Sequence, residues 1–219
     1  MNTTVTGIDC TKILFLDIET VPQYSSVLEL DDVERELWQK KSARLVEDGM
    51  SDEDLYKKAG IFAEFGKIIC ISAAFLRPKN GSYEMRVRSF YGDDEKEILN
   101  SFMSMVNKYF NTKKIFFCAH NGKEFDFPFI ARRALINGIQ IPLTLDSRGM
   151  KPWEIQHLDT LDLWRFGDYK NYTSLALLAH VFGIPTPKDD IDGSQVCDVY
   201  WQERDLQRIV KYRKKDVVT

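Results

Sequence analysis

The chain has 219 residues, of which 44% are hydrophobic and 29% are charged, and its formal net charge is -3. This composition is ordinary for a globular protein, and no apolar run approaches the length of a membrane span. A net negative charge does not by itself indicate a nucleic-acid binder, because such proteins are often basic. We expect residues 1–219 to form a single domain, since the length suffices for one sizeable core.

The predicted elements in chain order are a strand, a helical insertion, two strands of a hairpin, a helix, a strand, a helix, a short strand and further helices. Their expected bounds are 13–18, 27–60, 67–75 and 83–90 around a turn at 78–81, 93–110, 114–119, 127–137, 155–158, 174–182 and about 194–218. This order predicts an α/β fold with a mixed five-stranded sheet flanked by helices. We expect the insertion to be too short to bury a core of its own.

The N-terminal residues and the cysteines indicate the expected cellular compartment. The first residues have neither the basic nor the apolar region of a secretory signal. The four cysteines are far apart in the sequence and form no CxxC pair, which predicts reduced thiols in a cytoplasmic protein without a membrane anchor. They are Cys10, Cys70, Cys118 and Cys197.

Two carboxylates interrupt the apolar run 13–20, which is otherwise typical of a buried strand. Asp17 and Glu19 would point to the same face, because strand residues i and i+2 do so. Charged groups are rarely buried unless they are paired or bind a metal. If the strand is central, both acids fall near its carboxyl end, where open α/β sheets bind their ligands. The pair is therefore a candidate platform for a divalent cation.

Two further acids could join this pair. Asp126 follows the strand at 114–119, and alone it is more simply an N-cap for the helix that contains Pro128. Asp216 alone is more simply an exposed acid on a charged helix. That helix, however, has an apolar stripe, and Tyr212 and Asp216 lie four residues apart beside it. Both side chains could therefore face the sheet.

Four acids from separate elements suit the hydrolysis of a phosphodiester. Two cations about 3.5–4 Å apart can stabilise the attacking oxygen, the phosphorus charge and the leaving oxygen. Mg²⁺ and Mn²⁺ prefer oxygen ligands and need few carboxylates. A phenol beside such a site can orient the attacking water, which suits Tyr212.

These residues also resemble the three motifs of the DEDD 3′–5′ exonucleases. The motifs are Asp17-Ile18-Glu19-Thr20, Asn121 to Asp126, and Tyr212 with Asp216. The tyrosine resembles the DEDDy subclass, since the DEDDh subclass would have a histidine where this chain has Lys211. The sequence of these motifs is most similar to that of the proofreading domain of family B DNA polymerases, and more narrowly to that of the predicted 3′–5′ exonucleases related to that domain.

The resemblance implies a ribonuclease H-like fold and metal-dependent release of nucleoside monophosphates from a 3′ end. It implies that Asp17, Glu19, Asp126 and Asp216 bind two Mg²⁺ or Mn²⁺ ions and that Tyr212 positions water. It further implies that nucleic acid is contacted by Thr20, Val21, Asn121 and Phe125, although Phe125 suits the core equally well.

Three functions remain open from the sequence. The expected substrate is single-stranded DNA. RNA is the alternative, because the sequence identifies no residue that would recognise a 2′-hydroxyl and so distinguish the two sugars. A catalytically idle nucleic-acid-binding module is the third, which the complete set of acids argues against, because clustered acids repel phosphate unless cations neutralise them. A replication or repair protein could recruit the chain. His120 could touch substrate, and Asp159 and Asp162 are interpreted as helix caps.

Overall fold

The structure is a computed structural model that describes residues 4–5, 7–111, 115–185, 191 and 193–219, with the backbone alone for residues 4, 5, 212, 213 and 216. Its main element is a five-stranded sheet with the order β5-β4-β3-β6-β7. The bounds are Ile13–Pro22 for β3, Gly66–Lys79 for β4, Ser82–Tyr91 for β5, Phe116–Ala119 for β6 and Leu158–Asp159 for β7. β3, β4 and β5 are antiparallel, whereas β6 and β7 run parallel to β3. The predicted mixed five-stranded sheet is confirmed, and β3 is its central strand.

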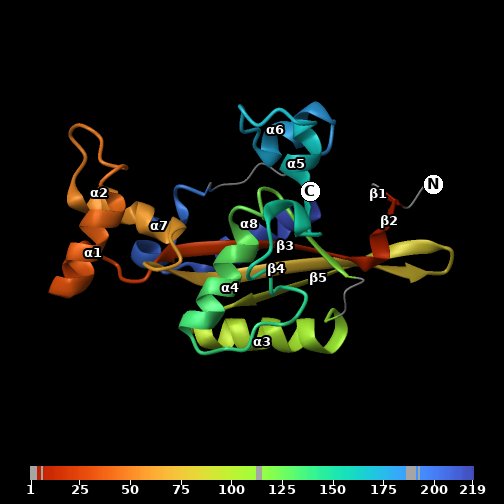
Figure 1. Cartoon of the computed structure of the whole chain (residues 1–219), viewed down its shortest axis with the longest axis horizontal. Coiled ribbons are helices and arrows are strands. Elements are labelled where there is room, and N and C mark those ends of the chain that lie inside the picture. Colours follow the sequence, from red (N-terminus) through yellow and green to blue (C-terminus); the bar gives the residue numbers. More distant parts are fainter. Residues whose placement is uncertain (1–3, 6, 112–114, 186–190, 192) are drawn as a thin grey trace.

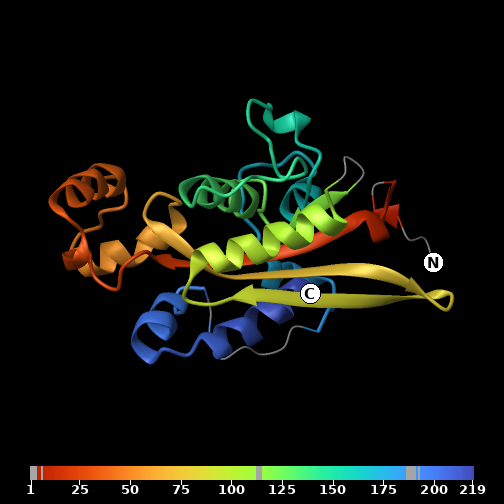
Figure 2. The same ribbon diagram turned by 90° about the horizontal axis from the view of Figure 1, so that it is seen from below.

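Helices cover both faces of this sheet (Figure 2). On one face lie α3 (Glu95–Tyr109) and α4 (Asp126–Ile136), and on the other lie α7 (Val196–Asp198) and α8 (Leu206–Val218). The large core lies under α3 and α4, where Leu14, Leu16 and Ile18 of β3 are buried. α3 begins where Asp94 accepts a hydrogen bond from the backbone N–H of Glu97, as an N-cap residue does. α5 (Thr160–Arg165) and α6 (Leu175–Val181) follow β7.

The helical insertion lies at one end of the sheet, opposite the tip of the β4–β5 hairpin (Figure 1). It contains α1 (Asp32–Ser42), α2 (Asp52–Lys57) and two 3₁₀ turns, η2 (Val27–Glu29) and η3 (Lys58–Ile61). The expectation that it has no core of its own is wrong, because Trp38 packs edge-on against Tyr56 in a separate buried cluster. That cluster also takes in Phe62 and Phe65, which lie beyond the insertion.

Several predicted boundaries differ from the structure, and two of the differences have a cause in local backbone geometry. Strand β4 continues through Lys79, so the hairpin turn is only Asn80-Gly81, with φ angles of 49° and 78°. Positive φ at both residues suits the right-handed twist of a two-residue hairpin. The helix expected over 194–218 is divided into α7, a π-helical turn η5 (Val199–Glu203) and α8, because Arg204 has φ 58° and Asp205 caps α8.

The smaller elements are β1 (Thr4–Val5), β2 (Ile8–Asp9), and the 3₁₀ turns η1 (Cys10–Lys12) and η4 (Pro152–Glu154). All four cysteines are free thiols, as the sequence predicts. None of the helices in the described ranges combines the length and the apolar composition needed to cross a bilayer.

Candidate active site

The two acids of β3 lie on the face of the sheet opposite the large core. The strand alternates, so that Leu14, Leu16 and Ile18 point toward α3 and α4, while Asp17 and Glu19 point the other way. Val21, two residues farther on the same face, packs against Ile209 of α8. Glu19 is only 5% exposed, whereas Asp17 is partly exposed. The two carboxylates therefore share the α8 face, as the spacing predicts.

A β-bulge lies directly after Glu19. Glu19 is opposite Cys70, but Thr20 is opposite Ile68, so Ile69 of β4 is the extra residue. The side chain of Ile69 joins Val21 in the cluster beneath α7 and α8. Bulges increase the local twist of a strand and redirect its side chains, and they are common beside active sites. Here the extra residue belongs to β4, so the bulge bends β4 beside the end of β3 that carries Glu19.

Asp126 reaches β3 from α4. Strand β6 pairs with β3 only at residues 13–15, so the backbone N–H of Ile18 lies beyond the end of that ladder. Asp126 accepts a hydrogen bond from this N–H at 3.1 Å, and its side chain is only 3% exposed. The N-cap interpretation of Asp126 is wrong, because Asp126 is the first residue of α4. The N-cap residue of α4 is Phe125, which makes no side-chain capping hydrogen bond. One hydrogen bond thus ties the third acid to the backbone between Asp17 and Glu19.

The turn that aims Asp126 is held by Asp159 at the end of β7. Asn121 has φ 62°, and its N–H donates to Asp159 Oδ1 at 2.8 Å, while the N–H of Lys123 donates to Oδ2 at 3.1 Å. Asp159 Oδ1 also accepts from the N–H of Leu161 at the start of α5, so its predicted capping role is confirmed. The sequence gives no sign that the same carboxylate also binds the β6–α4 turn.

Tyr212 and Asp216 lie in α8, but their side chains are outside the described set. The helix packs on β3 and β4, with Ile209 and Val210 buried. A cavity of about 130 Å³ opens beside Asp17, and Val217 and Thr219 help to line it. The last turn of α8 is therefore close to Asp17, while the positions of the Tyr212 and Asp216 side chains stay predictions.

The donor set suits a hard divalent cation, because every predicted ligand is a carboxylate. Within the described ranges, however, no three carboxylate, imidazole or thiol groups lie together closely enough to hold an ion. Asp216 is not among those groups, since only its backbone is described. Asp17, Glu19 and Asp126 thus share one region of β3, and the complete ligand set stays a prediction.

The four residues expected to contact nucleic acid differ in how far their side chains are exposed to solvent. Thr20 and Asn121 are partly exposed, so their side chains can be reached. Val21 is completely buried, which leaves only its backbone for such a contact. Phe125 packs against the large core, with its ring 5.3 Å from that of Phe129. The core interpretation therefore fits Phe125 better than a substrate contact does.

His120 is engaged within the fold. Its Nδ1 lies 2.9 Å from the hydroxyl of Thr160, and its Nε2 lies 2.8 Å from the carbonyl of Thr173. A carbonyl only accepts hydrogen bonds, so Nε2 carries a proton. Both ring nitrogens hold neighbouring segments together, although the residue also lines the cavity beside Asp17.

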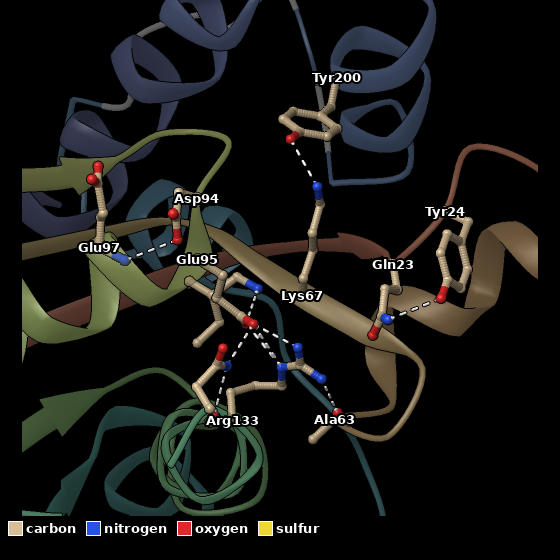
Figure 3. A network of polar contacts seen from close by, with 11 residues as sticks. Gln23, Tyr24, Ala63, Lys67, Asp94, Glu95, Glu97, Arg133 and Tyr200 are labelled. Carbon is tan, nitrogen blue, oxygen red and sulfur yellow. Dashed lines mark hydrogen bonds and ion pairs between the residues drawn. The ribbon is translucent and has the colours of Figure 1, made fainter. Parts of the chain in front are cut away.

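A buried ion pair clamps α4 to the sheet (Figure 3). Glu95, at the start of α3, accepts hydrogen bonds from Arg133 Nε at 2.9 Å and from the backbone N–H of Ile68 at 2.7 Å. Arg133 Nη1 also donates to the carbonyl of Ala63 at 2.9 Å. Ile68 lies at the bulge and Arg133 shares α4 with Asp126, so the pair fixes both relative to each other. Neither residue stands out in the sequence.

Comparison with known proteins supplies a family. Residues 61–219 match the family described as predicted 3′–5′ exonuclease related to the exonuclease domain of PolB. A DNA polymerase of Pyrococcus glycovorans is 26% identical over an alignment of 179 residues that covers 75% of this chain and 22% of the polymerase.

The comparison with solved structures concerns the fold alone. The family B DNA polymerase of Pyrobaculum calidifontis aligns with a TM-score of 0.54 at 16% identity, over 94% of this chain and 23% of the polymerase. E. coli Exonuclease I in complex with a dT13 oligonucleotide aligns with a TM-score of 0.42 at 14% identity, over 92% of this chain and 41% of that one. The chain thus spans less than a quarter of either polymerase. The first alignment agrees with the mixed sheet and helical layers, and the fold is ribonuclease H-like.

Proposed function

The chain belongs to the family of predicted 3′–5′ exonucleases related to the exonuclease domain of family B DNA polymerases, and from this premise we propose that it hydrolyses single-stranded DNA from the 3′ end. The products are nucleoside monophosphates. The ligands for two Mg²⁺ or Mn²⁺ ions are Asp17, Glu19, Asp126 and Asp216, in the pattern of the DEDDy subclass.

The observation that carries this proposal is the hydrogen bond from the Ile18 N–H to Asp126 Oδ1, at 3.1 Å. It ties an acid that is 108 residues away in the sequence to the backbone between Asp17 and Glu19. Carboxylates that lie near one another in a medium of low polarity disfavour their shared negative charge. Bound cations would offset that charge, which is a chemical reason for placing acids in one region of the fold.

The roles of the residues follow from their positions. Asp17 and Glu19 offer oxygen ligands from one rigid strand, and Asp126 offers a third that the Ile18 N–H holds in orientation. When bound, the two cations would stabilise the charge on the attacking and leaving oxygens. Tyr212 would hold the attacking water by a hydrogen bond from its phenol, and the partly exposed Thr20 and Asn121 would contact the terminal nucleotide.

Substituting Asp126→Asn tests the proposal while sparing the fold. The asparagine oxygen can still accept from the Ile18 N–H, but it lacks the charge that attracts a cation. We expect the thermal midpoint to stay close to that of the parent and the release of mononucleotides to fall by orders of magnitude. Asp48→Asn, at an exposed position in the insertion, is the matched control. Full activity of Asp126→Asn would refute the assignment.

Tyr212→Phe separates water positioning from metal binding. We expect slower turnover with unchanged affinity for Mn²⁺, measured by titration calorimetry, because the phenol does not belong to the ligand set. An equal loss of both would show that Tyr212 acts through the structure of α8.

A further inference from the structure

One cavity lined by described residues lies away from the acids. It is a groove of about 690 Å³ between the end of α3 and the β4–β5 hairpin. Its floor is apolar and consists of Leu14, Phe75, Met105, Phe110 and Ile115. Leu14 and Phe75 belong to the α3 side of the sheet, so the groove opens on the face opposite that of Asp17 and Glu19. A DNA strand bound at those acids would not pass through it.

The rim of this groove is basic. Arg86 and Arg88 of β5 are directly opposite Phe75 and Ala73 of β4, so their side chains stand on the groove side of the sheet. Arg77 of β4 also lines the groove. A rim of three arginines is notable in a chain whose net charge is -3.

These arginines have little local compensation. Glu84 is the only acid in 76–89, and it is engaged by Arg86 at 2.8 Å and by Lys79 at 3.2 Å. Hydrogen bonds from these two cations, and then the charges of Arg86 and Arg77, lower the pKa of Glu84. Among the described residues, Arg77 and Arg88 have no ion pair of their own, and Arg88 lies over the ring of Phe90 at 4.6 Å.

We propose that this groove binds a short acidic segment of a partner protein, with a large apolar side chain of that segment seated between α3 and the hairpin. The arginines would meet the carboxylates, to which a guanidinium donates two hydrogen bonds at once. The floor requires an apolar group, because burying a polar edge without a hydrogen-bond partner is unfavourable.

A protein segment suits the groove better than a nucleic acid does. Phosphates would satisfy the arginines equally well, but bases would place their polar edges on an aliphatic and aromatic floor. Phe75 and Phe110 of this floor already pack edge to face, with ring centroids 5.4 Å apart, so each ring has an aromatic partner within the fold. The proposal does not depend on the exonuclease activity.

The test uses the full chain and fluorescence anisotropy. The probe is a fluorescein-labelled peptide of four aspartates followed by a leucine and a phenylalanine. We expect saturable binding that weakens at least about tenfold in Arg77→Glu/Arg88→Glu, because a charge pair becomes a repulsion. Arg44→Glu, at an exposed position in the insertion, should bind like the parent. Replacing the leucine and phenylalanine of the peptide by serines should abolish binding to the parent chain.

Three outcomes would overturn the proposal. They are no binding of the peptide, equal binding by Arg77→Glu/Arg88→Glu, and binding that survives without the apolar residues. A labelled oligo(dT) supplies the competing case, since a loss of its binding in the double variant without any peptide binding would make the groove a nucleic-acid site. The double variant should digest short oligo(dT) at the parental rate, which separates this result from a failure of the catalytic assignment.

Discussion

Removing Arg133 should destabilise the protein more than removing the whole ion pair. The side chains of Glu95 and Arg133 are 7% and 6% exposed. In Arg133→Met, the carboxylate of Glu95 stays buried with hydrogen bonds from Ile68 and Asn137 but without its countercharge. Leaving a buried charge without its countercharge lowers the free energy of unfolding by about 3–5 kcal/mol. In Glu95→Met/Arg133→Met no buried charge remains, and the main loss is the acceptor of the Ile68 N–H, about 1–3 kcal/mol.

Urea unfolding followed by tryptophan fluorescence measures both values. At a slope of about 2 kcal/mol per molar, the single variant should unfold about 2 M earlier than the parent. The double variant should unfold at a higher urea concentration than the single variant. Lys40→Met, which breaks an exposed pair with Glu36, should change the free energy of unfolding by less than about 1 kcal/mol. A double variant as unstable as Arg133→Met would refute the charge argument.

Two further predictions concern the surroundings of the site. Burial lowers the pKa of His157 from 6.5 to about 4, so the unfolded chain takes up its proton first as the pH falls, and native stability drops below pH 6.5. His157→Asn keeps an acceptor for the N–H of Phe117. Between pH 7 and pH 5, the unfolding free energy of this variant should fall by about 2 kcal/mol less than that of the parent, as measured by urea titration. An unchanged pH profile would contradict this. In Gly122→Ala, the new Cβ would overlap that of Ala119 and stand 2.9 Å from Phe127 Cζ. We expect a loss of about 1–3 kcal/mol in unfolding free energy together with reduced nuclease activity, and a parental melting curve would show that the turn before α4 has spare room.

The sequence predicts the parts of the fold that depend on local patterns. The apolar run before Asp17, the alternation of β5 and the helical periodicity of α3 each specify an element from neighbouring residues. Asp17 and Glu19 stand out for the same reason, because charges within an apolar strand conflict with its pattern.

What the sequence does not predict depends on contacts between distant residues. The bulge at Ile69, the second role of Asp159 and the pair of Glu95 with Arg133 all join segments that are far apart in the chain. The break before α8 is partly local, since Asp205 is a recognisable cap, but the periodicity on either side of Arg204 conceals it. Asp126 lies between these cases, because its residue type suggests a cap and only the fold brings it to Ile18.

We propose that acids from β3 and α4 act together on the 3′ end of a nucleic acid. A time course on 5′-labelled single-stranded DNA and RNA of one sequence, with Mg²⁺, Mn²⁺ or EDTA, tests it most directly. We expect a descending ladder on DNA that EDTA abolishes and that Asp17→Ala reduces by orders of magnitude. Equal digestion by Asp17→Ala, or a ladder that persists in EDTA, would contradict it, and a ladder on RNA alone would reassign the substrate.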